Sequence, residues 1–132
     1  MPSARSLIAA ARAARANAYA PYSHFAVGAA VETLDGTVIT GANVENASYG
    51  LSICAERAAL VRAVAEGHRG FRAVAVAGPE DATIAPCGAC RQFIAEFDSA
   101  MPVAFTSPSG VVETTLAELL PYPFTPEALS RS

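Results

Sequence analysis

The chain has 132 residues, of which 52% are hydrophobic and 16% charged; this balance excludes a disordered protein and suits one domain spanning residues 1–132. Its formal net charge is −3 and its nine basic residues, all arginines, form no visible basic patch, which argues against nucleic-acid binding. No apolar stretch is long enough to cross a bilayer, and three cysteines are an odd count for a disulfide framework, so we expect a cytoplasmic protein.

The N-terminal segment predicts a helix that Ser3 can cap, because apolar side chains recur at helical spacing between residues 7 and 18. Pro21 cannot continue a helix and ends this one. Arg12 and Arg15 interrupt the apolar run, so the segment lacks the continuous hydrophobic centre of a targeting peptide.

A hairpin follows, since two strand-like segments, 25–34 and 37–46, flank Asp35-Gly36, a strong turn signal.

Gly67 then suits the end of a second helix. The element order α-β-β-α-β-α-β-β-α predicts a mixed sheet with helices on its faces. The later elements are expected as a helix over Cys54–Gly67, a strand over 71–78, a helix over 87–97, strands over 102–107 and 111–115, and a short helix over 114–120.

The three cysteines all lie where predicted helices begin, Cys54 at the second helix and Cys87 and Cys90 at the third. A helix N-terminus favours the thiolate, and three convergent thiolates suit Zn²⁺ while leaving a fourth position for water, the pattern of a catalytic zinc. Two alternatives remain open on these residues alone. The C-x-x-C pair can be a redox couple, and a structural zinc can be completed by His24 or, less readily in its loop, by His68.

Glu56 lies two residues after Cys54, in the first turn of the same predicted helix. Taken alone, an acidic residue there is explained by the helix dipole. Taken with "PCGAC" at 86–90, it forms the pattern C-x-E followed by P-C-x-x-C, the zinc-deaminase signature with cysteine as first ligand. In that chemistry one carboxylate beside the metal moves protons to the base and to the leaving amine.

Five motifs occur in order along nearly the whole chain: "APYSHFAVGAA", "GANVENASYG", "CAERAAL", "PCGACRQ" and "ELLPYPF". Together they resemble the small, homotetrameric class of cytidine deaminases. The resemblance implies an α/β fold, a single-domain three-layer α/β/α sandwich with a central mixed five-stranded sheet. Ser48 and Ser52 stand where relatives often have Cys and Thr, and neither departure removes a motif residue.

The resemblance also implies roles at the metal. Cys54, Cys87 and Cys90 would bind one Zn²⁺ per subunit, and Glu56 would be the proton shuttle. Three thiolates and Zn²⁺ leave excess negative charge, which something should offset. Arg57 and Arg91 can each donate to a thiolate, and the family assigns this role to the position of Arg57.

Substrate contacts follow from the resemblance alone. On spacing, Phe25 would be assigned to the core, and Asn43 and Glu45 to turn chemistry. The second helix is apolar around much of its circumference, so a partner subunit is expected against it. The implied roles are Phe25 stacking on the pyrimidine, Asn43 and Glu45 binding the ribose hydroxyls, the N–H of Ala55 holding the pyrimidine carbonyl, Tyr49 nearby in the site, and Phe124 entering a neighbouring subunit's pocket in a homotetramer.

The expected function is the zinc-dependent hydrolytic deamination of cytidine and deoxycytidine to uridine and deoxyuridine with release of ammonia, as in pyrimidine salvage. Two alternatives are a deaminase of a cytosine-nucleoside antibiotic such as blasticidin and a non-catalytic structural-zinc or thiol-redox protein. The segment "NVENASYG" fits the ribose-binding pattern and favours the first function. The acidic balance and short chain argue against polynucleotide editing.

Overall fold

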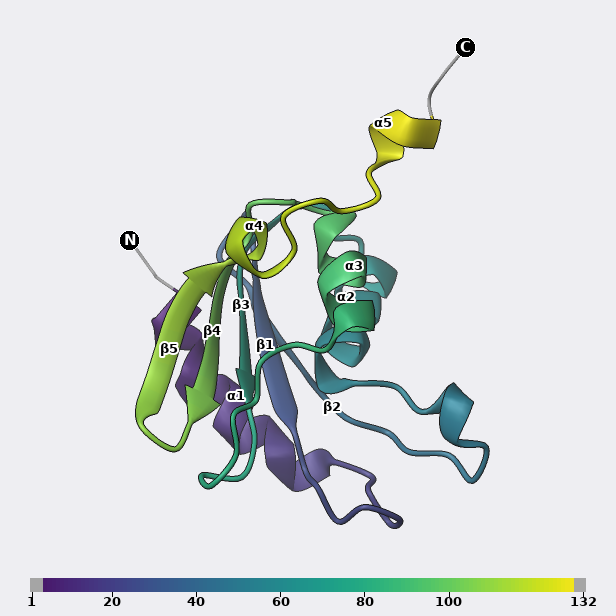
Figure 1. Ribbon diagram of the computed structural model, residues 1–132, viewed down its shortest axis with the longest axis vertical. Helices are drawn as coiled ribbons and strands as arrows, with labels where there is room; N and C mark the ends of the chain where they lie inside the picture. The colour runs from purple at the N-terminus through teal and green to yellow at the C-terminus, as the bar shows by residue number, and fades with distance from the viewer. Residues whose placement is uncertain (1–3, 130–132) are drawn as a thin grey trace.

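The structure, a computed structural model, describes residues 4–129 and has helices on both faces of one sheet (Figure 1). The predicted three-layer α/β/α arrangement is therefore confirmed. The predicted cap at Ser3 lies outside the described residues. The helical elements, with η for 3-10 helices, are η1 (Ala4–Leu7), α1 (Ile8–Ala14), η2 (Arg15–Asn17), η3 (Tyr49–Leu51), α2 (Ala55–Ala65), α3 (Gly88–Ala95), α4 (Leu116–Leu119) and α5 (Pro126–Leu129).

The five strands form one mixed sheet in the order β2-β1-β3-β4-β5. The central strand β3 (Phe71–Ala77) is antiparallel to β1 (Gly28–Thr33) and parallel to β4 (Pro102–Ser107). The edge strands β2 (Val38–Ala42) and β5 (Gly110–Thr115) pair antiparallel with β1 and β4. Because β3 and β4 are parallel, the chain must cross over between them, and α3 lies in that connection.

Helix α1 and the turn η1 before it cover one face of the sheet. Buried Leu7, Ile8 and Ala11 pack against strand alanines such as Ala75. The helix lies so close to β1 that a Cβ built at Gly28 would be 2.0 Å from the carbonyl oxygen of Ala11. Glycine at this position therefore allows the close helix–strand contact.

Helices α2 and α3 cover the opposite face, which holds the larger core. Leu60 of α2 and Ile94 of α3 are fully buried there against strand valines such as Val74. Helix α2 rests directly on β2, where a Cβ at Gly41 would lie 2.4 Å from the backbone nitrogen of Ala59. This close packing fixes the N-terminus of α2 relative to the sheet.

The predicted elements are found with shifted ends. The hairpin strands are shorter than expected, because the chain leaves the sheet after β2 and residues 43–53 pair only at isolated bridges of Val44 with Tyr19 and Ile53. Gly67 has φ +103° and ends α2 as predicted. The 3-10 turn η3 and the helix α5 were not predicted. Within residues 4–129, no helix is both long and apolar enough to span a membrane.

Candidate active site and metal centre

The three cysteines converge where two helices begin. Cys54 precedes α2, Cys87 precedes α3, and Cys90 lies in the first turn of α3. The sulfur of Cys87 is 3.9 Å from that of Cys54 and 3.4 Å from that of Cys90, and all three sulfurs lie within 4.8 Å of one another. Two sulfurs bound to one tetrahedral Zn²⁺ are about 3.8 Å apart, since each Zn–S bond is about 2.3 Å. The cluster thus fits zinc.

The alternatives left open by the sequence lose support from this arrangement. All three cysteines are free thiols, and the 3.4 Å between Cys87 and Cys90 is far longer than an S–S bond of about 2.05 Å. Among the described residues, the one group of side chains able to hold a metal consists of the three cysteines and includes neither His24 nor His68. A site with three protein ligands keeps an open position.

Arg57 supplies positive charge to the cluster. Its Nη2 donates to Cys54 Sγ across 3.5 Å. A hydrogen bond from Cys90, with further donation from Arg57 and Cys87, lowers the pKa of the Cys54 thiol to about 5 despite its partial burial. The shared hydrogen bond with Cys54, together with burial, raises the pKa of Cys90. These contacts favour the thiolate form of Cys54.

Arg91, the other arginine considered for this role, faces elsewhere. Its Nε donates to the carbonyl of Pro86 at 2.7 Å and its Nη1 to the carbonyl of Leu119 at 2.9 Å. It therefore contacts the backbone before Cys87 rather than a thiolate.

Glu56 points its carboxyl group into the interior beside the sulfurs. The residue is only 4% exposed, and burial, reinforced by the negative charge of Cys54, raises the pKa of its carboxyl. A carboxyl with a raised pKa gives up and takes back a proton closer to neutral pH, as general acid–base work requires. These properties suit a proton carrier, and the role of Glu56 as the proton shuttle stays a prediction.

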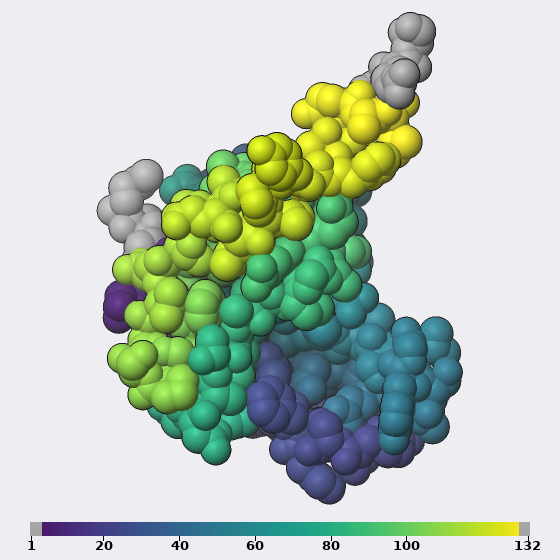
Figure 2. All heavy atoms as spheres, viewed as in Figure 1, coloured from purple at the N-terminus to yellow at the C-terminus, as the bar shows by residue number. Residues whose placement is uncertain are grey.

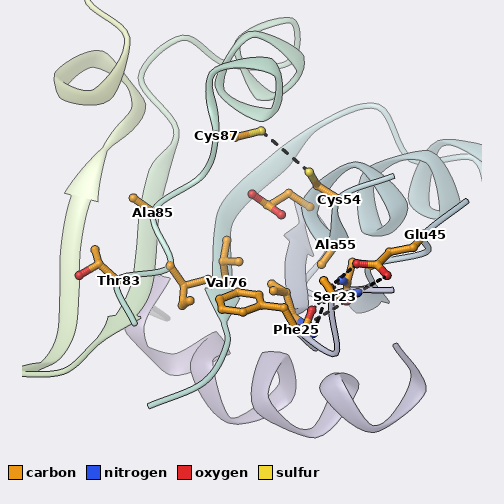
Figure 3. A pocket seen from close by; sticks show the side chains of 13 residues that line it. Ser23, Phe25, Glu45, Cys54, Ala55, Val76, Thr83, Ala85 and Cys87 are labelled. Atoms are coloured by element: carbon orange, nitrogen blue, oxygen red, sulfur yellow. Dashed lines mark hydrogen bonds between the residues drawn. The ribbon is translucent and has the colours of Figure 1, made fainter. Parts of the chain in front are cut away.

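A cavity of about 420 Å³ opens beside the cluster. In the space-filling view it is the hollow between the green segment before α3 and the blue segments around residues 25 and 45 (Figure 2). The sulfurs of Cys54 and Cys87 point toward each other at one end, and the ring of Phe25 lies at the other (Figure 3). The residues that line the cavity are Ser23, Phe25, Val27, Asn43, Glu45, Cys54, Ala55, Glu56, Val76, Thr83, Ile84, Ala85 and Cys87.

Phe25 lines this cavity and is 40% exposed, so it is not an ordinary core residue. Its position depends on Asn43, whose Oδ1 accepts from the N–H of Val27 and whose Nδ2 donates to the carbonyl of Phe25, both at 2.9 Å. One N–H of the Asn43 amide is left over. Asn43 therefore holds the aromatic ring in place and still offers a donor.

Glu45 holds the same loop from the other side. Its Oε1 accepts from the N–H groups of Tyr22 and Ser23, and its Oε2 accepts from the Ser23 hydroxyl. These hydrogen bonds, with that of the hydroxyl first, outweigh desolvation and lower the pKa of Glu45. A carboxylate has about four acceptor positions, so one remains for a ligand.

Of the three remaining predicted site residues, Ala55 lines the cavity of the single chain, whereas Tyr49 and Phe124 do not. The N–H of Ala55 is the first of α2 and has no helical acceptor, and Ala55 lines the cavity. Tyr49 does not line it; its ring is edge-to-face with Tyr22 at 5.9 Å, beside an adjoining hollow. Phe124 lies in the irregular segment between α4 and α5 and does not line the cavity either.

Besides Val27 and Val76, the sequence reasoning missed four loop residues that line the cavity: Ser23, Thr83, Ile84 and Ala85. Ser23 lies inside the motif "APYSHF", so its hydroxyl was a readable signal. The other three belong to the loop before Pro86, which carries no chemical pattern, and only the crossover from β3 to α3 brings them to the cavity.

Comparison with known proteins gives one family. Residues 1–106 match the family described as the cytidine and deoxycytidylate deaminase zinc-binding region. The chain is 50% identical over 126 residues to a cytidine deaminase of Sporosarcina psychrophila, covering 94% of this chain and 93% of that protein.

Solved structures agree with this match. The crystal structure of cytidine deaminase from Burkholderia pseudomallei is similar with a TM-score of 0.87 and 51% identity, covering 93% of this chain and all of that one. That of the Mycobacterium leprae enzyme has a TM-score of 0.74 and 46% identity, over 86% and 93% of the two chains.

Proposed function

The chain belongs to the cytidine and deoxycytidylate deaminase family, and from this premise we propose that it hydrolytically deaminates cytidine and deoxycytidine, releasing ammonia. One observation carries the proposal. A single cavity joins a three-sulfur zinc site, a buried carboxyl group at Glu56 and the exposed ring of Phe25. Deamination of a pyrimidine needs a metal-activated water, a proton carrier and a surface for the flat base.

When bound, Zn²⁺ supplies an activated water for attack on the pyrimidine ring. Glu56 carries protons to N3 of the base and then to its amino group, which becomes a good leaving group once protonated. Phe25 stacks on the pyrimidine, and the free N–H of Ala55 donates to its carbonyl oxygen. The cavity walls are otherwise mostly apolar, which suits the flat faces of a pyrimidine base.

The sugar is bound at the opposite end from the sulfurs. The remaining donor of Asn43 and the remaining acceptor position of Glu45 suit two neighbouring ribose hydroxyls. This pair favours a nucleoside over an isolated cytosine base, and it gives no support to the antibiotic-deaminase alternative.

We further propose that the active form is a homotetramer in the cytoplasm, where it serves pyrimidine salvage. Phe124 is 59% exposed on its own subunit, and Tyr49 and Leu51 are exposed as well. Exposed aromatic side chains of this size suit burial against another subunit. We assign Phe124 to a neighbour's cavity. Three free thiols that converge without a disulfide suit a reducing compartment.

The deciding experiment follows loss of ultraviolet absorbance for cytidine, deoxycytidine, blasticidin S and single-stranded DNA, with zinc analysis and light scattering on the same preparation. We expect turnover of the two nucleosides, about one zinc per chain and the mass of four chains. Zinc without turnover of any cytosine nucleoside would support the non-catalytic alternative. A fully active monomer would disprove the shared cavity.

A further inference from the structure

Two neighbouring side chains of α3 hold the C-terminal segment. Arg91 binds the carbonyl of Leu119 at the end of α4. Gln92 binds the backbone of Phe124 twice: its Nε2 donates to the Phe124 carbonyl at 2.7 Å, and its Oε1 accepts from the Phe124 N–H at 3.1 Å. Both side chains directly follow Cys90, so the segment is tied to the helix that carries two zinc ligands.

The two hydrogen bonds with Gln92 hold residues 121–124 of this segment. Pro121 and Pro123 have no N–H to donate, and Tyr122 is 95% exposed. Among the described residues, the hydrogen bonds that join 121–124 to the rest of the protein are the two from Gln92. After α4 the chain runs away from the sheet toward α5 (Figure 1).

A pair of hydrogen bonds to one residue does more than hold it. One bond would let the backbone of Phe124 turn about the contact, whereas a donor and an acceptor used together fix the orientation of the backbone on both sides of the Cα. The direction of the Cα–Cβ bond follows from that backbone orientation, so the amide of Gln92 sets the side from which the exposed side chain of Phe124 leaves the backbone.

We propose that Gln92 is a positioning residue, which aims Phe124 out of its own subunit and thereby sets the affinity of a neighbouring subunit's cavity for nucleoside. The inference rests on the proposed function, in which Phe124 enters that cavity. Gln92 itself does not line the cavity of its own subunit and touches no reacting atom. Its loss therefore alters binding of the substrate and spares the chemistry at the sulfurs.

The test is a double-mutant cycle with Gln92→Ala and Phe124→Ala, measuring KM and kcat for cytidine with zinc content and melting temperature. We expect Gln92→Ala to raise KM roughly 3- to 30-fold, as loss of one or two hydrogen bonds allows, with kcat within about twofold and zinc unchanged. In the Phe124→Ala background the same substitution should leave KM nearly unchanged, because the ring it aims is gone.

Gln92→Glu is the matched variant, since it keeps the size of the side chain and its acceptor but replaces the donor with an oxygen facing the Phe124 carbonyl. We expect it to raise KM at least as much as Gln92→Ala, and it decides the matter if Gln92→Ala does not fold. Wild-type KM in both Gln92 variants, or an equal rise with and without the Phe124 ring, would overturn the inference alone. Wild-type KM in Phe124→Ala would overturn the proposed shared cavity as well.

Discussion

The guanidinium of Arg57 lies 3.5 Å from the sulfur of Cys54, one turn earlier on the same chain segment, and the contact places a fixed positive charge at the edge of the metal site. Arginine stays protonated at any relevant pH, so this charge is permanent. It favours the thiolate of Cys54 before any metal arrives, and it offsets the net negative charge that three thiolates leave on bound Zn²⁺.

Arg57→Ala should therefore increase the number of protons released when zinc binds the metal-free protein at pH 6. With a pKa of about 5, Cys54 of the wild type is already largely ionised at pH 6 and releases little. The hydrogen bond from Cys90 is the first cause of this low pKa and remains in the variant, but without the hydrogen bond and charge of Arg57 the pKa of Cys54 rises, so more of its proton goes to the buffer on zinc binding, up to one per site. Calorimetry in buffers of different ionisation enthalpy counts these protons.

Arg62→Ala is the control for this measurement. Arg62 lies on the same helix, but its Nε pairs with Glu66 at 3.0 Å and not with a sulfur. The control should release as many protons as the wild type. Equal counts in Arg57→Ala and wild type would remove Arg57 from the electrostatics of the site.

Glu56→Gln should retain about one zinc per chain and lose nearly all turnover. The substitution keeps the size of the side chain and leaves the three sulfurs intact, but an amide cannot carry the protons. Loss of a well-placed acid–base group lowers kcat on the order of 10²–10⁴-fold, and by more where one group serves several transfers. Zinc analysis checks the retained metal, and single-turnover kinetics on the same preparation checks the lost turnover. A wild-type kcat would refute the mechanism.

Glu56 should also make the folding stability of the metal-free protein depend on pH, and Glu56→Gln should remove this dependence. Burial raises the pKa of Glu56, so its contribution to folding stability is fully present below the pKa of the unfolded chain and is lost as pH rises through the folded value. The unfolding free energy of metal-free Glu56→Gln, minus that of the metal-free wild type, should therefore increase from pH 4 to pH 7. Urea unfolding at the two pH values measures the gain, and a constant difference would contradict it.

Removing a cysteine sulfur should abolish zinc binding, whereas removing a histidine should leave it unchanged. Cys87→Ala and Cys90→Ala each delete one of the three thiolates and should lose both zinc and activity. His24→Ala and His68→Ala should bind zinc as the wild type does, since neither imidazole belongs to the cluster. Metal analysis of the four purified variants decides, and zinc loss in either histidine variant would indicate a closed structural site.

Each half of the metal centre could be predicted from its own motif, whereas the meeting of Cys54 with Cys87, 33 residues apart, was implied by the family resemblance. Cys54, Cys87 and Cys90 lie at helix starts, and a helix start fixes where its first side chains point. The layering of the fold was readable for a similar reason, since hydrophobic periodicity and the Asp35-Gly36 turn act over short stretches of chain.

The parts that could not be predicted depend on how distant segments meet. Asn43 and Glu45 hold the loop that carries Phe25, a second role that no pattern in their own segment indicates. Arg91 follows a zinc ligand and still turns to Leu119, because α4 happens to end within its reach. Tyr49 lies outside the cavity of its own chain, a placement set by the irregular path after β2.

The final prediction concerns the contact that fixes α2 against the sheet. A Cβ at Gly41 would lie 2.4 Å from the nitrogen of Ala59 and 2.9 Å from the carbonyl oxygen of Ala55, and both are backbone atoms that cannot turn aside. Gly41→Ala must push α2 away from β2, which costs about 1–3 kcal/mol of folding stability as overpacked sites do. It also moves the start of α2, and Cys54 with it, so zinc affinity should fall together with the melting temperature.

Gly70→Ala is the matched control. A Cβ there would lie as close, 2.4 Å, but to the end of the Leu34 side chain, which is exposed and free to move. The control should unfold within about 0.5 kcal/mol of the wild type and bind zinc normally. Thermal unfolding and zinc titration of the two variants separate the cases: equal stability would mean that the α2–β2 contact yields easily, and normal zinc affinity in a destabilised Gly41→Ala would mean that the sulfur cluster does not depend on it.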